Sequence, residues 1–500
     1  MAGCRLGECP MVSADLLLHG VALSDEMQVE VGDPRRTERI QNVVEALSRA
    51  PDKSYPQAFE NKTELEGFYR LIDNAHLSVP KVLATHLEKT AERSRQLGQV
   101  LVIHDTKEVS FSLRDGRFRQ HLCQISSSRQ GFWMHTSLVA SADGLRAPLG
   151  VVGMRPYVHE DKLQDDEARA FWAREYGQLA CESDRWLEAV EAADSALWEV
   201  ESVVHVMDRE GDIYELLERM RHKQDQFVIR AAQNRKIVQS SLEHAPKLFD
   251  AVAAQPVLAT RTVELSPRSV SDRPPAERKR QPARGRRWAR LQIRSASVEL
   301  LRPQKRRELQ ALSDRVAVNV VEVVEVDPPQ GEEPVYWLLL TSEPIDTVEQ
   351  LLWVVDAYRS RMQIEEFFKA IGTGCGYNKR QLNTAQHLLL ALALTLPVAW
   401  KLLVMRHLER QCPEAPAQAV VSETQLLLLK QAVAKWRWSA EPTVREVTGA
   451  IARLGGHLKS NGRPGWLTLG RGYQALLMME SGWEAAMQMM HRTQQHWSGL

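Results

Sequence analysis

Cysteine is scarce in this chain and is not arranged to hold a metal or to build a disulfide framework. The 500 residues include six cysteines, and no two of them form the CxxC pair that is typical of zinc sites. They are scattered at Cys4, Cys9, Cys123, Cys181, Cys375 and Cys412. A small disulfide-stapled fold and a zinc module are therefore excluded, and the pattern favours a reducing cytosol.

An excess of charge of one sign is also missing. Lys and Arg together number 64, Asp and Glu together number 64, and the pI is near 7.3. A uniformly basic nucleic-acid binder is therefore excluded, and a polyanionic partner would have to meet local basic patches. The 44% hydrophobic and 26% charged residues are typical of a globular protein.

Long hydrophobic runs are limited to one. The run "LLLALALTLPVAWKLLVM" begins at Leu388 and is interrupted by Pro397 and Lys401, which favours a buried helix over a membrane span. The first twenty residues contain no sustained apolar core of the kind that a secretory signal needs. We therefore expect a cytoplasmic protein that has no membrane partner.

The succession of sequence patterns indicates an α/β protein with helical ends. Residues 34–95 have helical periodicity, and "GQVLVIHDT" at 98–106 is typical of a strand buried on both faces. Further short strands, among them a separate "VSFSLR", are expected before a helical stretch at 165–199, and "SVVHVMD" at 202–208 predicts another buried strand. Neither a repeat of 20–50 residues nor a low-complexity tract is present.

We expect three domains, since a chain of this length normally exceeds one core. A helical N-terminal domain at 1–85 is followed by an α/β domain at 86–375, which contains a β-rich insertion at about 233–334. Residues 376–500 are expected to form a helical C-terminal domain.

Two aspartates and one glutamate are the residues best suited to carry chemistry. Asp105 and Asp208 are expected where two buried strands end, and Glu365 lies in an expected helix. Carboxylate oxygens are the ligands that Mg²⁺ prefers, and three of them could hold two cations about 4 Å apart. Such a pair activates a water or a sugar hydroxyl for attack on a phosphodiester. The order of strand, meander, helix, strand and later helix predicts a ribonuclease-H-like mixed sheet flanked by helices.

The stretch "YRSRMQIEEFFKA" at 358–370 predicts a helix with a charged face and an apolar face. At about 100° per residue, the charged face contains Tyr358, Arg361, Glu365 and Lys369. We therefore prefer Glu365 over its neighbour Glu366 as the ligand. The two basic side chains would neutralise phosphates, and the tyrosine would hydrogen-bond one.

At these residues the chain resembles the bacterial cut-and-paste transposases of the insertion-sequence IS-four group, and within that group the Tn-five branch. The signature of that family on this helix is Tyr, two residues, Arg, three residues, Glu, six residues and Lys. Tyr358, Arg361 and Glu365 match it, and the final lysine position is Gly372. Similar stretches are "GDPRRTERIQN" at 32–42, "EGFYRLIDN" at 66–74, "IHDT", "DREGDIYE" and "ARLGGHLKSNGRPGW" at 452–466, so that the resemblance spans about 30–485.

The resemblance implies an activity and assigns roles to residues. Asp105, Asp208 and Glu365 become the ligands of two Mg²⁺ ions, with Mn²⁺ as a substitute. Trp337 becomes the side chain that stacks on a flipped DNA base, and Arg230 a DNA contact. A homodimer would bind the inverted ends of a transposon, nick them, form and open hairpins, and join the ends to target DNA, so that the protein lies at the bacterial nucleoid when it is bound to DNA. The N-terminal end-binding contacts are expected from Arg35, Arg36 and Arg39.

Alternatives remain open for both the activity and the residues. The protein could be a nuclease that cuts without joining, or a catalytically silent regulator that occupies transposon ends, an idea to which only Gly372 lends support. Judged by composition, Trp337 would be a core residue, and the basic run 278–290 would be either a loop or a track for the DNA backbone. Glu210 and Asp212 are expected to cap a helix. His104 and His135 are expected to be structural.

Overall fold

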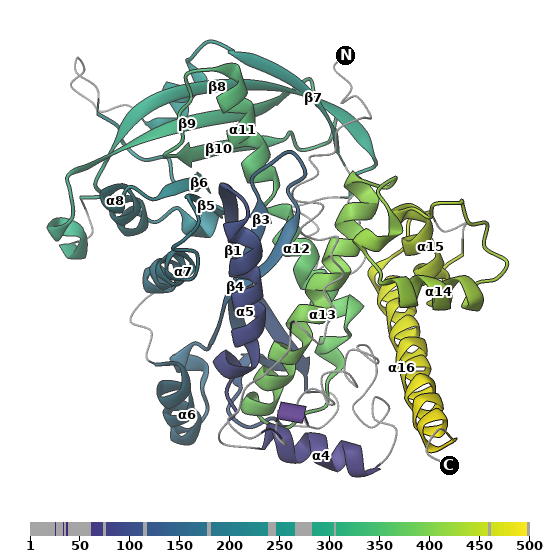
Figure 1. Ribbon diagram of the computed structural model, residues 1–500. Helices are drawn as coiled ribbons and strands as arrows, with labels where there is room; N and C mark the ends of the chain where they lie inside the picture. Colours follow the sequence, from purple (N-terminus) through teal and green to yellow (C-terminus); the bar gives the residue numbers. More distant parts are fainter. Residues whose placement is uncertain are drawn as a thin grey trace.

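A computed structural model of the 500-residue chain gives a mixed α/β architecture with one large sheet between helices (Figure 1). It describes residues 26, 34, 37–38, 62–73, 77–113, 118–177, 182–238, 247–265, 283–304, 307–458 and 462–497. Arg35, Arg36 and Arg39 lie outside the described residues. The sheet has ten strands, in the order β2-β3-β1-β5-β6-β10-β9-β8-β7, and β4 pairs with β3 beside that path.

The half of the sheet that contains β1 and β5 has the strand arrangement of ribonuclease H. An antiparallel meander is formed by β1 (Gln99–Ser112), β3 (Arg129–Ser141) and β4 (Pro148–Tyr157). Two strands then continue the sheet in parallel from β1, namely β5 (Ser202–Met207) and β6 (Gln226–Arg230). The order β4-β3-β1-β5-β6 confirms the fold class that the sequence predicts.

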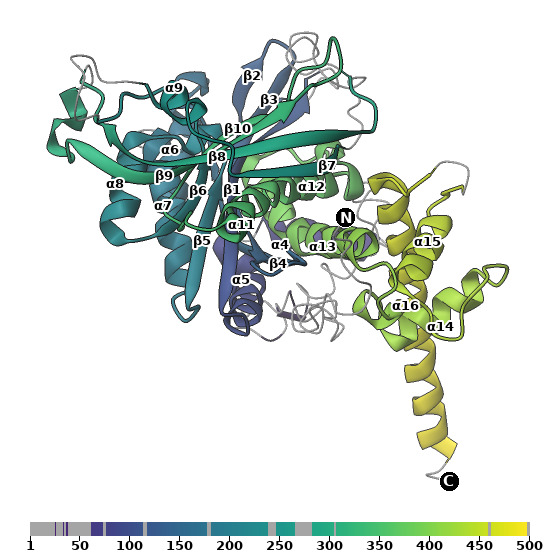
Figure 2. The ribbon, with the colours of Figure 1, turned by 90° about the horizontal axis from the view of Figure 1, so that it is seen from above.

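Strands β7, β8 and β9 lie in the segment 233–334 that the sequence marks as β-rich, and β10 follows directly after that segment. They form an antiparallel extension of the same sheet, because β10 pairs with β6 and is followed by β9, β8 and β7 (Figure 2). Their bounds are β7 (Ala259–Leu265), β8 (Arg287–Leu301), β9 (Arg315–Val326) and β10 (Tyr336–Thr341). A short β2 (Cys123–Ser126) pairs with β3 at the other end of the sheet.

Helices cover both faces of the sheet. One face carries α7 (Glu182–Ala196), α8 (Tyr214–Lys223) and α9 (Leu248–Ala253), and α6 (Asp166–Tyr176) packs beside β4. The other face carries α11 (Val348–Arg359), α12 (Met362–Lys369) and α13 (Ala385–Gln411). Towards the chain ends lie α4 (Lys62–Ile72), α5 (Val79–Arg95), α14 (Glu423–Ala432), α15 (Val444–Leu454) and α16 (Trp466–Trp497).

The apolar helix α13 is part of the main core. It packs against α5 and β4, and its Trp400 indole donates a hydrogen bond to the carbonyl of Pro148 on β4 at 2.9 Å. Within the described residues it is the one helix long and apolar enough to cross a membrane, and its apolar window is completely buried. Pro397 lies inside the helix without ending it.

Strand β1 is longer than the sequence predicts. Its antiparallel pairing with β3 continues to Ser112, so the expected separate strand "VSFSLR" is an extension of β1. Its parallel pairing with β5 ends at Ile103. The expectation that Asp105 stands at a strand end is therefore wrong: it lies in the middle of β1, two residues beyond the point where β5 stops pairing.

Candidate active site at the end of β5

The alternation of side chains along two neighbouring strands brings Asp105 and Asp208 to the same place. On β1, Leu101 and Ile103 pack into the core below α12, and Asp105 shares their side of the strand. On β5, Val204 and Val206 belong to the same core, and Asp208 continues that side just after the strand. Because Ile103 pairs with Val206 in a parallel register, the two aspartates lie level with each other.

Asp208 starts a tight turn after β5. It is the N-cap residue of the 3-10 turn Arg209–Gly211, and its Oδ1 accepts a hydrogen bond from the backbone N–H of Glu210 at 2.8 Å. This bond orients the carboxylate and leaves its second oxygen directed at the neighbouring groups. A strand end followed by a capped turn therefore holds the side chain in place.

The helix that carries Glu365 is divided in two. The segment α11 ends at Arg359, α12 begins at Met362, and Ser360 and Arg361 form a tight turn between them. The N–H of Arg361 bonds to the carbonyl of Tyr358 at 3.0 Å, three residues earlier. The expected single helical face from 358 to 369 is therefore interrupted, and the turn places Arg361 over the two aspartates.

The guanidinium of Arg361 contacts all three predicted ligands. Its Nη2 lies 2.8 Å from Oδ2 of Asp105 and 3.4 Å from Oδ2 of Asp208, and its Nη1 lies 3.2 Å from Oε1 of Glu365. Two of these partners are 256 and 153 residues away in the sequence. The structure therefore brings together the three carboxylates that the sequence selects.

Asp105 is the most buried member of this cluster, with 6% of its surface exposed. Burial raises the pKa of its carboxyl group; Arg361 opposes the shift, and Asp208 and Glu365 add to it, so that the pKa is about 7. The pKa of Arg361 is raised because its three acidic neighbours outweigh its burial. The cluster thus contains more negative charge than its one guanidinium balances.

Tyr358, Arg230 and Trp337 form a second group beside the carboxylates. Burial raises the pKa of the Tyr358 hydroxyl, and this side chain also hydrogen-bonds with that of Arg230. Arg230, at the end of β6, donates a hydrogen bond to the carbonyl of Tyr336 at 2.8 Å. Trp337 on β10 is partly exposed, and its ring lies 5.3 Å from that of Tyr358. Three of the expected DNA contacts thus adjoin the aspartates through Tyr358.

Lys369 does not point at the carboxylate cluster. Its Nζ lies 2.7 Å from Oε1 of Glu366, and Arg406 and Arg410 of α13 approach the other oxygen of Glu366 at 3.5 and 3.7 Å. The reason is that α12 turns Glu366 towards α13, whose cations attract it. Lys369 follows Glu365 by about one helical turn in α12, but its ion pair is with Glu366, and the sequence did not indicate the pairing of Glu366 with α13.

Two further expectations concern residues near Asp208 and Asp105. Asp212 does not cap the start of α8, whose N-cap residue is Ile213: it forms a buried ion pair with Arg235 and accepts hydrogen bonds from the N–H groups of Ala232 and Gln233 at 2.7 and 2.8 Å. His104 is completely buried on the opposite side of β1, where it bonds to His205 at 2.9 Å. Burial holds the pKa of His104 well below its usual value.

The described part of the basic run pairs with acidic side chains. Arg286 contacts Glu264, Arg287 contacts Glu325 and Glu332, and Arg290 lies 2.9 Å from Asp327. Residues 278–282 lie outside the described residues. Where the structure describes it, this run therefore enters β8 with its charges matched across strands.

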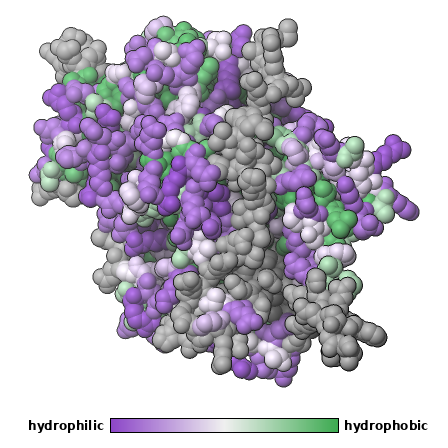
Figure 3. Space-filling model, viewed as in Figure 1, coloured by the Kyte–Doolittle hydropathy of each residue, from purple (hydrophilic) through white to green (hydrophobic). Residues whose placement is uncertain are grey.

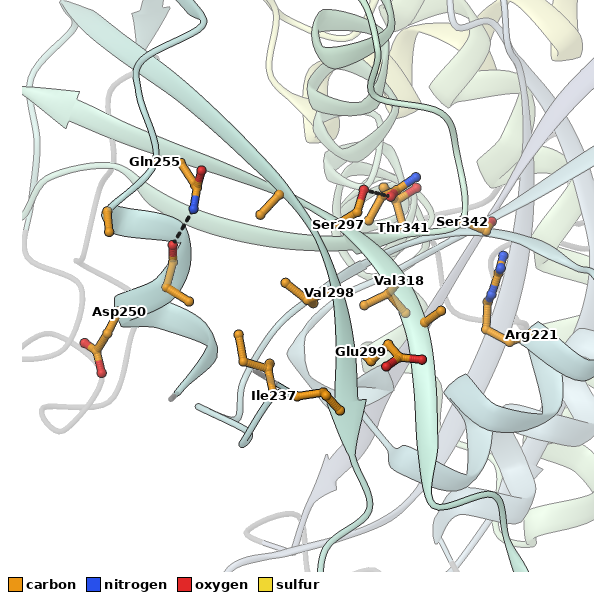
Figure 4. A pocket seen from close by; sticks show the side chains of 16 residues that line it. Arg221, Ile237, Asp250, Gln255, Ser297, Val298, Glu299, Val318, Thr341 and Ser342 are labelled. Carbon is orange, nitrogen blue, oxygen red and sulfur yellow. Dashed lines mark hydrogen bonds between the residues drawn. The ribbon is translucent and has the colours of Figure 1, made fainter. Parts of the chain in front are cut away.

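A hollow of about 960 Å³ lies elsewhere, on the sheet extension between α9 and the strands β8 and β9. Small side chains such as Ala254, Ala296 and Ser297 line much of it, and its two acids, Asp250 and Glu299, lie on opposite sides (Figure 4). It contains none of the predicted site residues. The two acids of this hollow do not converge, unlike the three carboxylates at the end of β5.

The donor atoms at the end of β5 suit a hard divalent cation. Three carboxylates, from β1, the turn after β5 and α12, supply only oxygen, which Mg²⁺ prefers. Within the described residues no three acidic, histidine or cysteine groups already surround a common point where a metal ion would fit, because the carboxylates face the guanidinium of Arg361. Three carboxylates face one guanidinium, so the cluster has more acidic than basic groups. The residues fit a metal, provided that the arginine moves.

Comparison with known families agrees with this geometry. Residues 22–77 match the family model described as transposase DNA-binding, and residues 182–397 match the family model described as transposase DDE domain. The second match contains Asp208 and Glu365, whereas Asp105 lies before it. The matches support a DDE transposase of the IS-four type with a DNA-binding segment and a DNA-cleaving domain, and DDE transposases generally use divalent metal ions.

Proposed function

We propose that this protein is a cut-and-paste transposase of the Tn-five branch of the IS-four group. It nicks DNA at the inverted ends of its element, forms and opens hairpins there, and joins the ends to target DNA. The observation that carries the proposal is the meeting of Asp105, Asp208 and Glu365 at one guanidinium, beside a tyrosine and a tryptophan.

Each side chain of the cluster has a role in this reaction. Asp105, Asp208 and Glu365 would hold Mg²⁺, or Mn²⁺ in its place, with two ions in each site. When bound, the ions activate the attacking oxygen and stabilise the leaving one. Arg361 and Arg230 would hold the phosphates, and Trp337 would stack on a base turned out of the duplex. Burial raises the pKa of Tyr358, so its hydroxyl stays protonated and can donate a hydrogen bond to a phosphate.

A surface that suits the proposed homodimer lies on the C-terminal helices. Figure 2 shows that α16 runs away from the body of the protein, and its exposed side chains include Met478, Trp483, Met489 and Met490. The face in Figure 3 is largely hydrophilic, with an apolar area over the C-terminal helices at the right. Apolar side chains on a projecting helix suit pairing with a second copy. We propose this dimer as the unit that holds two DNA ends in the bacterial cytoplasm, at the nucleoid.

The test is a cleavage assay with the whole protein. A DNA fragment bounded by the inverted ends of its own element is incubated with Mg²⁺ or with a chelator, and nicks, hairpins and joined products are separated on gels. We expect all three products with Mg²⁺ and none with the chelator. Nicks without joined product would replace the proposal by a nuclease, and a gel shift without cleavage would replace it by a silent end-binding regulator.

A further inference from the structure

Arg361 occupies an unusual position, because one guanidinium neutralises three carboxylates from three separate elements. Asp105 comes from β1, Asp208 from the turn after β5, and Glu365 from α12, and all three lie between 2.8 and 3.4 Å from Arg361 nitrogens. With 14% of its side chain exposed, Arg361 is largely enclosed by this cluster. It therefore does for the carboxylates what a cation would do, since it offsets their mutual repulsion.

The guanidinium and a divalent cation compete for the same atoms. Oδ2 of Asp105 and Oδ2 of Asp208 both face Nη2 of Arg361. A metal ion held by these oxygens would lie directly against a positive guanidinium, and the low polarity around Asp105 would strengthen that repulsion. The two cations cannot share the site in this arrangement.

Little besides the carboxylates holds the guanidinium in place. Its Nε is buried and has no hydrogen-bond partner among the described residues. The residue lies at the turn between α11 and α12, outside both helices, and Tyr358 and Arg230 lie on the adjacent side, where the proposed DNA would pass. A phosphate there would offer Arg361 two oxygens in the geometry that a guanidinium prefers.

We propose that Arg361 is an internal counter-ion of the three carboxylates that a DNA phosphate draws away, so that the protein takes up divalent cations tightly only once DNA is bound. The inference rests on the proposed function, because it assumes that DNA reaches this cluster. Binding of DNA and binding of metal then favour each other by the same factor, as linkage requires. Free protein would thereby avoid metal-dependent cleavage chemistry away from its substrate.

The test measures Mn²⁺ binding to the free protein, with the electron paramagnetic resonance of unbound Mn²⁺ as the readout. Arg361→Gln removes the counter-ion, and Arg361→Lys keeps a charge. Arg359→Gln is the matched control, because Arg359 lies two residues earlier and pairs with Asp356 at 2.9 Å instead of with the cluster. We expect Arg361→Gln to bind Mn²⁺ at least about tenfold more tightly than the wild type, a factor within the usual range of coupling between sites. Arg361→Lys should stay closer to the wild type, and Arg359→Gln should match it.

A second measurement covers the case in which the repelling carboxylates disturb the fold. Thermal unfolding of Arg361→Gln without metal should occur at a lower temperature than that of the wild type, and Mn²⁺ should restore more stability to the variant than to the wild type. A DNA duplex that carries the element's inverted end is then added, and the Mn²⁺ that the DNA binds by itself is subtracted. The duplex should raise the Mn²⁺ affinity of the wild type and should change the Mn²⁺ affinity of Arg361→Gln much less.

Equal Mn²⁺ affinity in the wild type, Arg361→Gln and Arg359→Gln would overturn the inference, even if the wild type cleaves DNA. Conversely, tight Mn²⁺ binding by Arg361→Gln together with a wild type that never cleaves DNA would reject the proposed function and leave the counter-ion role in place.

Discussion

The rings of Trp337 and Tyr358 meet edge to face, with centroids 5.3 Å apart and an angle of 66° between their planes. The contact joins β10 to the end of α11, and Tyr358 is in turn hydrogen-bonded to Arg230 on β6. A partly exposed tryptophan is thereby held beside the carboxylates in a definite orientation. A base that leaves the duplex near the scissile bond would find an aromatic surface already in position.

Loss of that surface is expected to affect hairpin formation more than nicking. In Trp337→Ala the base loses a stacking partner that is worth about 1–3 kcal/mol, and hairpin product should fall about tenfold or more while the first nick persists. The measurement is the ratio of hairpin to nicked product over time. Trp198→Ala serves as control, because Trp198 is 74% exposed in the turn that follows α7. Equal ratios in both variants would remove Trp337 from the reaction.

Amide replacements of the three carboxylates should separate cleavage from binding. Asp105→Asn, Asp208→Asn and Glu365→Gln each keep the shape of the side chain and remove a charged ligand. Since loss of even an outer partner of a metal ligand costs about 10–100-fold, we expect each to lower cleavage by more than about 100-fold. Cleavage gels and gel shifts on the same DNA check the two activities. Asp166→Asn, at a side chain that is 98% exposed on α6, is the control.

Retained cleavage in any one of the three variants would exclude that residue as a ligand. Loss of DNA binding in all three, with folding intact, would instead give the cluster a role in binding alone.

Gly372 stands where the related transposases have a lysine, and this position has room for one. A Cβ atom there would come no closer than 3.5 Å to the nearest side chain outside the adjacent residues, which is an ordinary contact with Asn378. We expect Gly372→Lys to fold and to bind DNA about two- to fivefold more tightly, with the salt dependence steeper by about one counterion. Gly482→Lys adds the same charge on α16, in open space. An equal gain in that control would show that only net charge matters.

Glu26 should stabilise the fold in a pH-dependent way. Its carboxylate is 1% exposed and pairs with His86 and Arg93 of α5. Although burial opposes the shift, these two partners lower its pKa to about 2. Because the pKa of Glu26 is lower in the folded protein, its contribution to the free energy of unfolding is complete above pH 4.5, the pKa in the unfolded chain. This contribution is lost as the pH falls towards 2.

The variant Glu26→Gln is therefore expected to lose about 3 kcal/mol in the free energy of unfolding at pH 7, because Arg93 is left buried without its counter-charge. The difference in the free energy of unfolding between variant and wild type, measured by urea titration, should fall as the pH is lowered from about 4.5 to about 2. The control is Glu92→Gln, which removes the charge of an exposed ion pair with Lys89 on α5. It should change the free energy of unfolding by less than about 0.5 kcal/mol. A gap that persists unchanged at low pH would mean that Glu26 acts through shape and not through charge.

The sequence predicted the strand arrangement around β1 and β5, which the structure confirms, and it selected three carboxylates that the structure brings together; their role as metal ligands stays a prediction. Continuous apolar runs identify buried strands, and the alternation of side chains then decides which faces Asp105 and Asp208 share. The charged face expected for 358–369 singled out Glu365 over Glu366, and the structure places Glu365 at Arg361 and Glu366 against α13. The fold class and the convergence of these residues could be foreseen because both depend on local patterns and chain order.

Only the tertiary structure decided how these groups contact one another. The extent of β1 depends on its pairing with β3, and the break before α12 depends on packing, so the mid-strand position of Asp105 and the turn at Arg361 have no local pattern. The same holds for the ion pair of Lys369 with Glu366, whose other oxygen faces Arg406 and Arg410 of α13, and for the ion pair of Asp212 with Arg235. Ion pairs between distant residues depend on where helices and strands come to lie, and periodicity along a chain carries no information about that.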